Sequence, residues 1–254
     1  MLRSAEVMHL VARRAAEFGV EVEGSVRFRL KVAVARKNDI VRGIHRSIHG
    51  ALEGQSDRID FLRGEARFLS AHEVDTGDRR LSFEKAIVAT RARRAVPPIP
   101  GLDSVDTLDN QSALLLEELP ESLIVIGGGY VGIEFAQMYA RFGSRVTLLG
   151  RNQQLAPSED PELTDLLADY LREEGIDVRT GASVTAVRED GSSKVVSAQI
   201  GGEARDFRAE SILLAAGRVG NTERLDLASA GVASGKRGFI EVDEQLRTNR
   251  PHIW

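Results

Sequence analysis

A glycine-rich run of six residues, with three of its four glycines at the spacing of a known motif, is the strongest chemical signal in this chain. The run is Gly127-Gly128-Gly129-Tyr130-Val131-Gly132, a GxGxxG pattern. In this pattern the first glycine permits a tight turn and the second lets the backbone approach a pyrophosphate, while the third allows a helix to pack closely on a strand. The N-terminus of the following helix offers N–H groups and partial positive charge to phosphates. The chemistry that these residues predict is dinucleotide binding.

The pattern alone is weak evidence, because glycine-rich turns are common, so its sequence context decides. Ser122–Ile126 (SLIVI) comes directly before it and is a continuous apolar run, typical of a strand buried on both faces. Residues 131–142 follow it with the pattern of a helix. This is the strand–loop–helix context that the motif requires. The alternative is an ordinary strand–turn–helix junction with three convenient glycines, and the order of the surrounding elements argues against it.

The choice of cofactor is expected at the end of the second strand, where a carboxylate would accept from a ribose 2′-OH. The strand Arg145–Leu149 is followed by Gly150 and Arg151, with no carboxylate. A guanidinium at Arg151 suits a 2′-phosphate through charge-assisted hydrogen bonds. The sequence therefore favours NADPH over NADH, with a solvated loop arginine as the alternative for Arg151.

The elements that must position these residues alternate from residue 122 onward. A helix over 161–174 and a strand over 176–179 complete a β-α-β-α-β order, which predicts a parallel sheet with right-handed crossovers. Three further strands are expected to form a meander before a last strand returns to the sheet: 183–189, 194–200, 205–209 and 211–216.

The first hundred residues are less regular. Helices are expected over 1–19, ending at Gly19, and over 39–52. The prolines of residues 96–101 predict a hinge or domain boundary, and Arg91, Arg93 and Arg94 before them are expected in an exposed linker. Short strands are predicted at 59–62, 66–69, 72–75, 80–83 and 86–89.

Composition excludes several classes of function. The 254 residues contain no cysteine, so they hold no disulfide, thiolate metal ligand or cysteine nucleophile. The net charge of −4 favours neither nucleic acid nor a membrane surface as partner, and no apolar run reaches the ~20 residues of a membrane span. A cytoplasmic protein is expected. His45 and His49 have a spacing that can hold a metal, but no third ligand lies nearby in sequence, so a solvated helix face is favoured and no metal is predicted.

The chain also resembles a known family. The segments LIVIGGGYVGIEFAQMYARFGSRVTLLGR, IVATRARRAVPPIPG, LLAAGRVGNTERL and FIEVDEQLRTNRPHIW resemble, in collinear order, the flavin-dependent pyridine nucleotide–disulfide oxidoreductases, especially their mercuric reductase-like and dihydrolipoamide dehydrogenase-like branches. The resemblance implies an α/β fold in which a Rossmann-type NAD(P)-binding domain is inserted in an FAD-binding domain. It places a partial FAD-binding domain at 1–115, the NAD(P)H-binding domain at 116–235 and the start of the returning FAD segment at 236–254.

The resemblance further implies FAD and NADPH as cofactors and a role for single residues. Tyr130 matches the aromatic residue that shields the flavin face, and Glu134 matches the acid near nicotinamide and flavin. The turn that closes the nucleotide domain falls on Gly217 and Arg218, and the ATG motif beside FAD begins at Ala89 and Thr90. From the residues alone, Tyr130 could equally cover the helix surface, and Glu134 could be a first-turn carboxylate that the helix dipole favours.

The sequence departs from the family pattern in four places. It begins after the position of the family's own FAD phosphate loop and Cys-x4-Cys pair, it ends before the Gly-Asp that contacts flavin, and it lacks the interface domain through which the family forms homodimers. Arg91 stands where the ATG motif has glycine. We therefore expect the interior of a reductase, truncated at both ends, with no catalytic residue of its own.

Two hypotheses follow for the function of this chain. In the first, the intact enzyme passes hydride from NADPH to FAD and on to a cysteine pair, which reduces a disulfide or Hg(II). In the second, the chain is a non-catalytic NAD(P)-binding module or an inactive remnant that lacks the redox cysteines.

Overall fold

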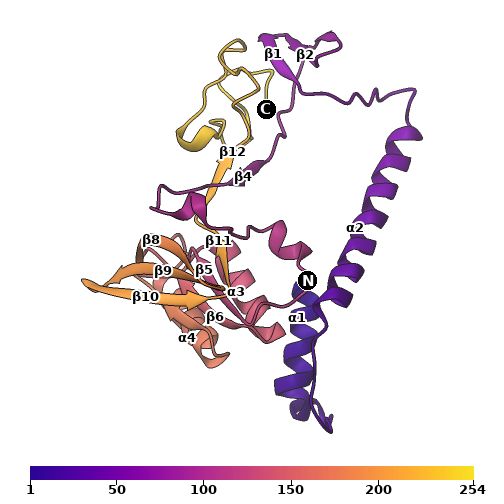
Figure 1. Ribbon diagram of the computed structural model, residues 1–254. Helices are drawn as coiled ribbons and strands as arrows, with labels where there is room; N and C mark the ends of the chain where they lie inside the picture. The colour runs from indigo at the N-terminus through magenta and orange to yellow at the C-terminus, as the bar shows by residue number, and fades with distance from the viewer. The chain divides into compact units, whose positions relative to one another are not determined.

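The computed structural model describes residues 1–254 and shows two compact units (Figure 1). The first unit contains Met1–Ile44 and Val96–Gly217, and the second contains His45–Ala95 and Arg218–Trp254. One boundary falls at Val96, where the sequence predicts a hinge. The three domain ranges implied by the resemblance stay a prediction.

A parallel sheet forms the centre of the first unit. Its strand order is β11-β5-β6-β7, and helices lie in the connections that follow β5 and β6 (Figure 1). This confirms the predicted β-α-β-α-β order and the return of the last strand beside the first. The elements are β5 (Ser122–Ile126), α3 (Tyr130–Phe142), β6 (Arg145–Leu149), α4 (Pro161–Glu173), β7 (Asp177–Arg179) and β11 (Ser211–Leu214).

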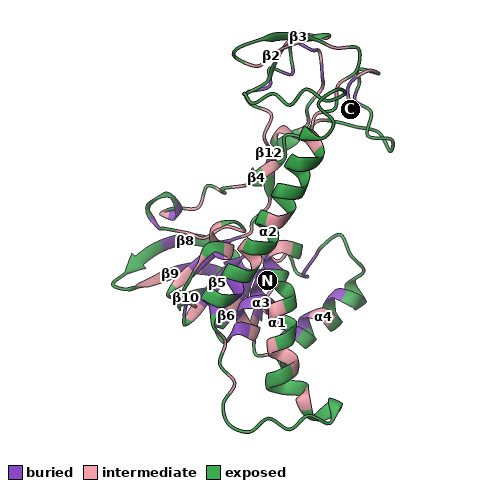
Figure 2. Ribbon diagram, turned by 90° about the vertical axis from the view of Figure 1, so that its right-hand side faces the viewer, coloured by how far each residue is buried: buried purple, intermediate pink, exposed green.

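Both faces of this sheet are buried, which explains the continuous apolar run of β5. Leu123 and Val125 belong to a core cluster with residues of α1 (Leu2–His9), α3 and α4, whereas Ile124 and Ile126 belong to a second cluster with residues of the predicted meander. Figure 2 shows the buried residues concentrated in the sheet and in α3. The sheet is therefore a rigid platform whose carboxyl-terminal edge carries the glycine run.

The meander is confirmed as a separate antiparallel sheet of order β10-β9-β8. Val187, Val196 and Ala209 turn toward the parallel sheet and are nearly fully buried, at 3%, 0% and 5% exposure. Its strands are β8 (Ser183–Asp190), β9 (Ser193–Ile200) and β10 (Glu203–Ala209).

The two N-terminal helices are also present. α1 continues as a π turn over Leu10–Arg14 and a 3-10 turn over Ala15–Phe18, and it ends at Gly19 in the left-handed conformation, as predicted. The second helix, α2 (Leu30–Glu53), begins well before the predicted residue 39. Its buried positions lie in that earlier part, whereas the predicted apolar face of Ile40, Ile44 and Ile48 is about half exposed.

The second unit contains two small sheets. Strands β1 (Arg67–Ser70), β2 (Glu73–Asp75) and β3 (Arg80–Ser82) form an antiparallel sheet, which confirms three of the predicted strands. Its core contains mainly Phe68, Leu225, Leu227, Ala230, Val232 and Ile253.

Three expectations for the second unit were wrong. Residues 59–62 form no strand, because no neighbouring segment pairs with them. Residues 86–89 form only an isolated bridge between Ala86 and Ile253. The arginine-rich segment is not a free linker: β4 (Ala92–Arg94) pairs with β12 (Arg218–Gly220), a partner more than a hundred residues away that local sequence does not reveal.

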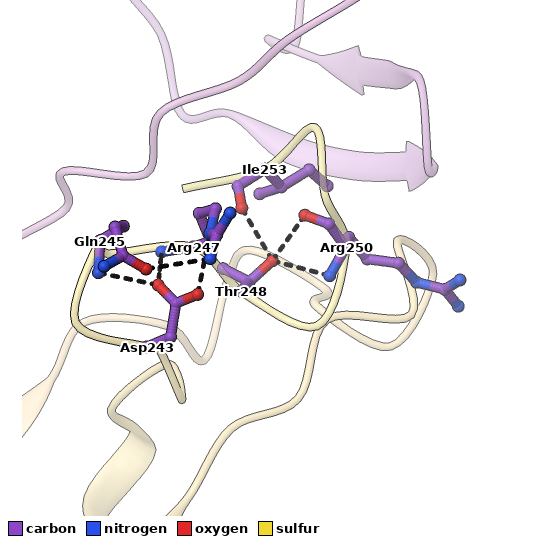
Figure 3. Close-up of polar contacts among 6 residues, drawn as sticks. All are labelled: Asp243, Gln245, Arg247, Thr248, Arg250 and Ile253. Atoms are coloured by element: carbon purple, nitrogen blue, oxygen red, sulfur yellow. Dashed lines mark hydrogen bonds and ion pairs between the residues drawn. The ribbon is translucent and has the colours of Figure 1, made fainter.

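A turn near the C-terminus is fixed by its own side chains (Figure 3). The carboxylate of Asp243 accepts from the backbone N–H and the Nε of Arg247 at 2.9 and 2.8 Å. The buried Thr248 hydroxyl donates to the carbonyl of Ile253 at 2.8 Å and accepts from the N–H of Arg250 at 3.0 Å. These bonds place the last residues beside Ala86, where the isolated bridge forms.

Candidate nucleotide-binding site

The glycine run joins the carboxyl end of β5 to the first turn of α3. Gly129 is the N-cap of α3, and no side chain caps the helix. The first N–H groups of a helix have no partner within it, so this terminus presents donors and partial positive charge. Such a terminus at the end of a parallel strand is suited to bind phosphate.

Two of the three motif glycines are required by the fold itself. Gly127 has φ +132°, and a Cβ added there would lie 2.2 Å from the carbonyl oxygen of Ala215. A Cβ on Gly132 would lie 1.8 Å from the carbonyl oxygen of Gly127. No larger residue fits at either position, because backbone atoms of Ala215 and Gly127 lie too close.

Gly129 is different, because the folded chain leaves space around it. Its φ of −85° is open to any residue, and an added Cβ would meet no atom within 4 Å. Gly128 is more crowded, with an added Cβ 3.1 Å from the Cα of Gly150 and from Leu155. The fold therefore leaves open the position at which the motif brings a pyrophosphate against the backbone.

A pocket of about 410 Å³ opens at this edge of the sheet. Its volume lies within the range of small-molecule sites, and the carboxyl edge of a parallel sheet is where α/β folds bind ligands. The structure brings five of the predicted residues into its lining: Gly127, Gly128, Gly129, Arg151 and Gly217. Apolar side chains provide most of the remaining wall, including Ile99, Ile126, Leu149 and Val184.

Arg151 is the only charged residue in the pocket lining. It follows Gly150, whose N–H donates to the carbonyl of Arg179 and whose carbonyl accepts from the N–H of Ala182, both at 2.8 Å. These bonds fix the backbone directly before the guanidinium. With no carboxylate in the lining, the electrostatics of the pocket suit an anion.

Four predicted residues of α3 lie outside the pocket lining, and one of them is Gly132, which packs against the carbonyl of Gly127. Tyr130 is 57% exposed, and its hydroxyl bonds to the Ser158 hydroxyl at 3.0 Å and to the Glu159 carboxylate. Val131 is half-buried against the core, and Glu134 is exposed. Their predicted roles toward a cofactor stay predictions.

Sequence reasoning missed part of the lining. Asn152, Gln154 and Pro157 follow β6 directly, and Pro97 belongs to the predicted hinge. The first three could have been found from the rule that loops after parallel strands line the ligand crevice. The contact of Tyr130 with Ser158 and Glu159 had no such signal, because it joins residues almost thirty positions apart.

The remaining candidates lie in the second unit. Ala89 is exposed, and the backbone carbonyl of the next residue, Thr90, accepts a hydrogen bond from the Asn221 side chain at 3.1 Å. The Arg218 guanidinium donates to the carbonyl of Ala92 at 2.5 Å. Arg91 has φ +66°, in the left-handed region that favours glycine. The backbone therefore keeps the conformation expected for the glycine of the ATG motif, although the residue is arginine.

The histidine pair and the helices provide no further site. His49 lies edge-on to Phe61 with ring centroids 5.8 Å apart, and nowhere in the chain do three potential histidine, cysteine or carboxylate ligands gather. None of the helices combines the length and the apolar character needed to cross a bilayer.

Comparison with known proteins extends these observations to the whole chain. A mercuric reductase from Bacillus cereus is 35% identical over 254 residues, which cover 100% of this chain and 40% of the relative. A dihydrolipoyl dehydrogenase from Thermus scotoductus is 33% identical over 258 residues, covering 100% of this chain and 54% of the relative. The chain thus spans about half the length of the curated relatives it matches.

A solved structure shares the fold. The copper(II) complex of the HOCl-induced flavoprotein disulfide reductase RclA from Escherichia coli matches with a TM-score of 0.81 and 30% identity, over 100% of this chain and 53% of the other. This confirms the expected α/β class of FAD/NAD(P)-binding proteins. Residues 4–254 match the family described as pyridine nucleotide-disulphide oxidoreductase. Together with the glycine loop and its pocket, these matches show that the chain belongs to that family.

Proposed function

We propose that this chain binds NADPH at the loop 127–132 and orients its nicotinamide for hydride transfer to FAD in a flavin-dependent reductase. The observation that carries the proposal is the pocket at the edge of the parallel sheet. It joins the sterically open backbone at Gly129 to a lining whose only charge is Arg151. That combination suits a dinucleotide with an additional phosphate.

Each part of the pocket has a task in this proposal. The backbone at Gly128 and Gly129 and the N-terminus of α3 hold the pyrophosphate, and Arg151 pairs with the 2′-phosphate. NADPH, when bound, supplies the hydride that FAD accepts. The contribution of these residues is to bind and orient, because the cofactors carry the redox chemistry.

For FAD, the residues present fit only in part. Ala89 and Thr90 offer backbone beside Arg91, whose glycine-like φ keeps the local turn but whose long cationic side chain replaces an open glycine. The chain has a single strand–glycine loop–helix junction, at 127–132, and the proposal gives that junction to NADPH. In the proposal, the phosphates of FAD are therefore held by groups outside these residues.

The electron acceptor is proposed from the relatives. Their names, mercuric reductase and dihydrolipoyl dehydrogenase, support Hg(II) or a disulfide as the acceptor of an intact enzyme. This chain contains no cysteine to pass electrons onward, so the dithiol of such an enzyme lies outside these residues. The homodimer implied by the resemblance belongs to that same intact protein.

The direct test is calorimetric titration of the purified chain with NADPH and with NADH. We expect saturable NADPH binding that is at least ~10-fold tighter than NADH binding, which is the order of one charge-assisted contact. Absence of binding by either nucleotide would refute the proposal. Equal affinities for NADPH and NADH would support the dinucleotide site but would show that Arg151 does not bind the 2′-phosphate.

A second candidate function is a nucleotide-binding module without electron transfer, and the complete absence of cysteine favours it. The two functions differ in how the chain treats flavin. A chain that retains FAD on gel filtration, and whose flavin absorbance bleaches with NADPH under anaerobic conditions, acts as a reductase core. A colourless chain that binds NADPH but retains no FAD is the binding module.

A further inference from the structure

The segment 151–160 decides where Arg151 is held. It connects β6 to α4 and contains neither helix nor strand, yet four pocket-lining residues belong to it: Arg151, Asn152, Gln154 and Pro157. A segment without regular structure must be fixed by individual contacts if it is to present a guanidinium in one place. Its contacts therefore bear directly on nucleotide selectivity.

The middle of the segment is fixed against the glycine loop. Leu155 is 1% exposed and packs in the core, and the N–H of Ala156 donates to the carbonyl of Gly128 at 2.8 Å. Nearer Arg151, the carbonyl of Asn152 accepts from the N–H of Gly181 at 2.7 Å. These are backbone and core contacts that most side-chain substitutions would leave in place.

The far end of the segment is held by Tyr130. The tyrosine is the first residue of α3, and its hydroxyl bonds to the Ser158 hydroxyl at 3.0 Å and to the Glu159 carboxylate. The side-chain amide of Gln154 donates to the carbonyl of Glu159 at 3.1 Å. Since Gln154 lines the pocket, this bond connects the contacts of Tyr130 to the pocket wall. Because Tyr130 is 57% exposed, its contribution to core packing is small and its hydroxyl bonds dominate.

We propose that Tyr130 is a positioning residue for nucleotide selectivity: its hydroxyl holds the segment 151–160 so that Arg151 faces the pocket. The inference rests on the proposed NADPH site and is separate from the flavin-facing role implied by resemblance. Without the hydrogen bonds of the Tyr130 hydroxyl, the segment gains conformational freedom, and it must lose that freedom again when Arg151 binds the 2′-phosphate. NADH lacks that phosphate, so its binding does not depend on the hydroxyl bonds of Tyr130.

The test compares Tyr130→Phe with the unchanged full chain by calorimetry, using NADPH and NADH as probes. We expect the NADPH dissociation constant to rise about 5-fold, as for loss of two exposed hydrogen bonds of which one is to a charged group, with the NADH constant changing less than ~2-fold. In an Arg151→Ala background the same substitution should have no further effect, because the two residues act through one contact. Tyr170→Phe is the matched control, since Tyr170 is 53% exposed on α4 and lies outside the pocket lining.

Three results would overturn the inference. Equal weakening of both nucleotides would indicate a general structural role, and unchanged constants would mean that the hydroxyl bonds do not position Arg151. Additive effects of the two substitutions would show that they act independently. If Tyr130→Phe does not fold, Glu159→Ala removes the charged partner of the Tyr130 hydroxyl from an exposed position, leaves the bond to Ser158, and must weaken NADPH binding selectively. An unchanged chain that binds no NADPH refutes the proposed function first, and the positioning role with it.

Discussion

At the scale of single residues, the motif glycines have separable tasks. An added Cβ meets the carbonyl of Gly127 when placed on Gly132, but meets nothing when placed on Gly129. We expect Gly129→Val to fold with a loss of about 1 kcal/mol, because valine is a poorer N-cap than glycine, and to lose NADPH binding by blocking the backbone. Gly132→Ala should instead unfold the domain. Thermal melting followed by calorimetry separates the two effects, and retained affinity in Gly129→Val would make the loop purely structural.

Arg151 tests the choice between the two nucleotides. Replacing it with glutamate puts a carboxylate into a pocket that has no other charge, at the place where NAD-specific sites bind the ribose hydroxyl. Arg151→Glu is expected to weaken NADPH at least ~10-fold while NADH binds as well or better. The measurement is the ratio of the two dissociation constants. An unaltered ratio would show that Arg151 is a solvated loop residue.

Arg91 provides a third test at this scale, in the second unit. Its φ of +66° costs a non-glycine residue about 1 to 2 kcal/mol of folding free energy. A glycine there avoids that cost but loses more backbone entropy on folding, which offsets part of the gain. Arg91→Gly should therefore stabilise the chain by about 0.5 to 1 kcal/mol in urea unfolding. Arg93→Gly is the matched control, because Arg93 bonds to the carbonyl of Gly220 at 3.1 Å within β4 and should lose stability. Equal destabilisation by both would contradict the argument.

At the scale of elements, Glu174 ties α4 to α3. Its carboxylate, 16% exposed, accepts from Arg141 Nε at 2.7 Å and from Gln137 at 2.8 Å. Burial raises the pKa of Glu174, but the hydrogen bonds and charge of Arg141, together with His9 and Gln137, outweigh burial and leave the pKa below the ordinary 4.5. Because the folded pKa is the lower one, the stabilisation is present above pH 4.5 and disappears as the pH falls through the folded pKa.

This linkage predicts a stability loss that depends on pH. Glu174→Gln should cost about 1 kcal/mol near pH 7, because a hydrogen-bonded ion pair is lost from a partly exposed site, and the cost should vanish once the pH falls below the folded pKa of Glu174. Glu173→Gln, on the exposed neighbouring residue, is the control. Urea unfolding at several pH values measures both variants. A cost that persists at low pH would mean that shape rather than charge joins the two helices.

The elements also show what the sequence can predict and what it cannot. β5, α3 and β6 follow from local pattern, because a strand buried on both faces must be continuously apolar and its glycine loop has one usual context. Residues 59–62 also have a largely apolar, strand-like composition, but no partner strand lies beside them. β4 and the tie from Tyr130 to Glu159 depend on partners distant in sequence. Local sequence pattern therefore predicts the glycine loop, whereas part of the pocket wall could be identified only from the three-dimensional structure.

At the scale of the whole molecule, the two units differ in how well they are packed. In the first, side chains of β5, β6 and β11 reach exposures of 0 to 1%, in two clusters on opposite faces of the sheet. The second has one smaller cluster of six buried residues. Since burial of apolar surface is the main favourable term in folding, the units should open with different free energies.

Hydrogen exchange followed by mass spectrometry tests this difference directly. We expect the slowest exchange within 122–217, above all in β5 and β6, because opening them requires disruption of both core clusters. Peptides from 45–95 should exchange much faster, and the first 44 residues should be protected only where Ala5, Leu30 and Val34 join the core. NADPH should add protection at the glycine loop and at 151–160 while leaving 45–95 unchanged, since ligand binding stabilises the unit that binds it. Uniform protection along the chain would show instead that the two units unfold as one cooperative body.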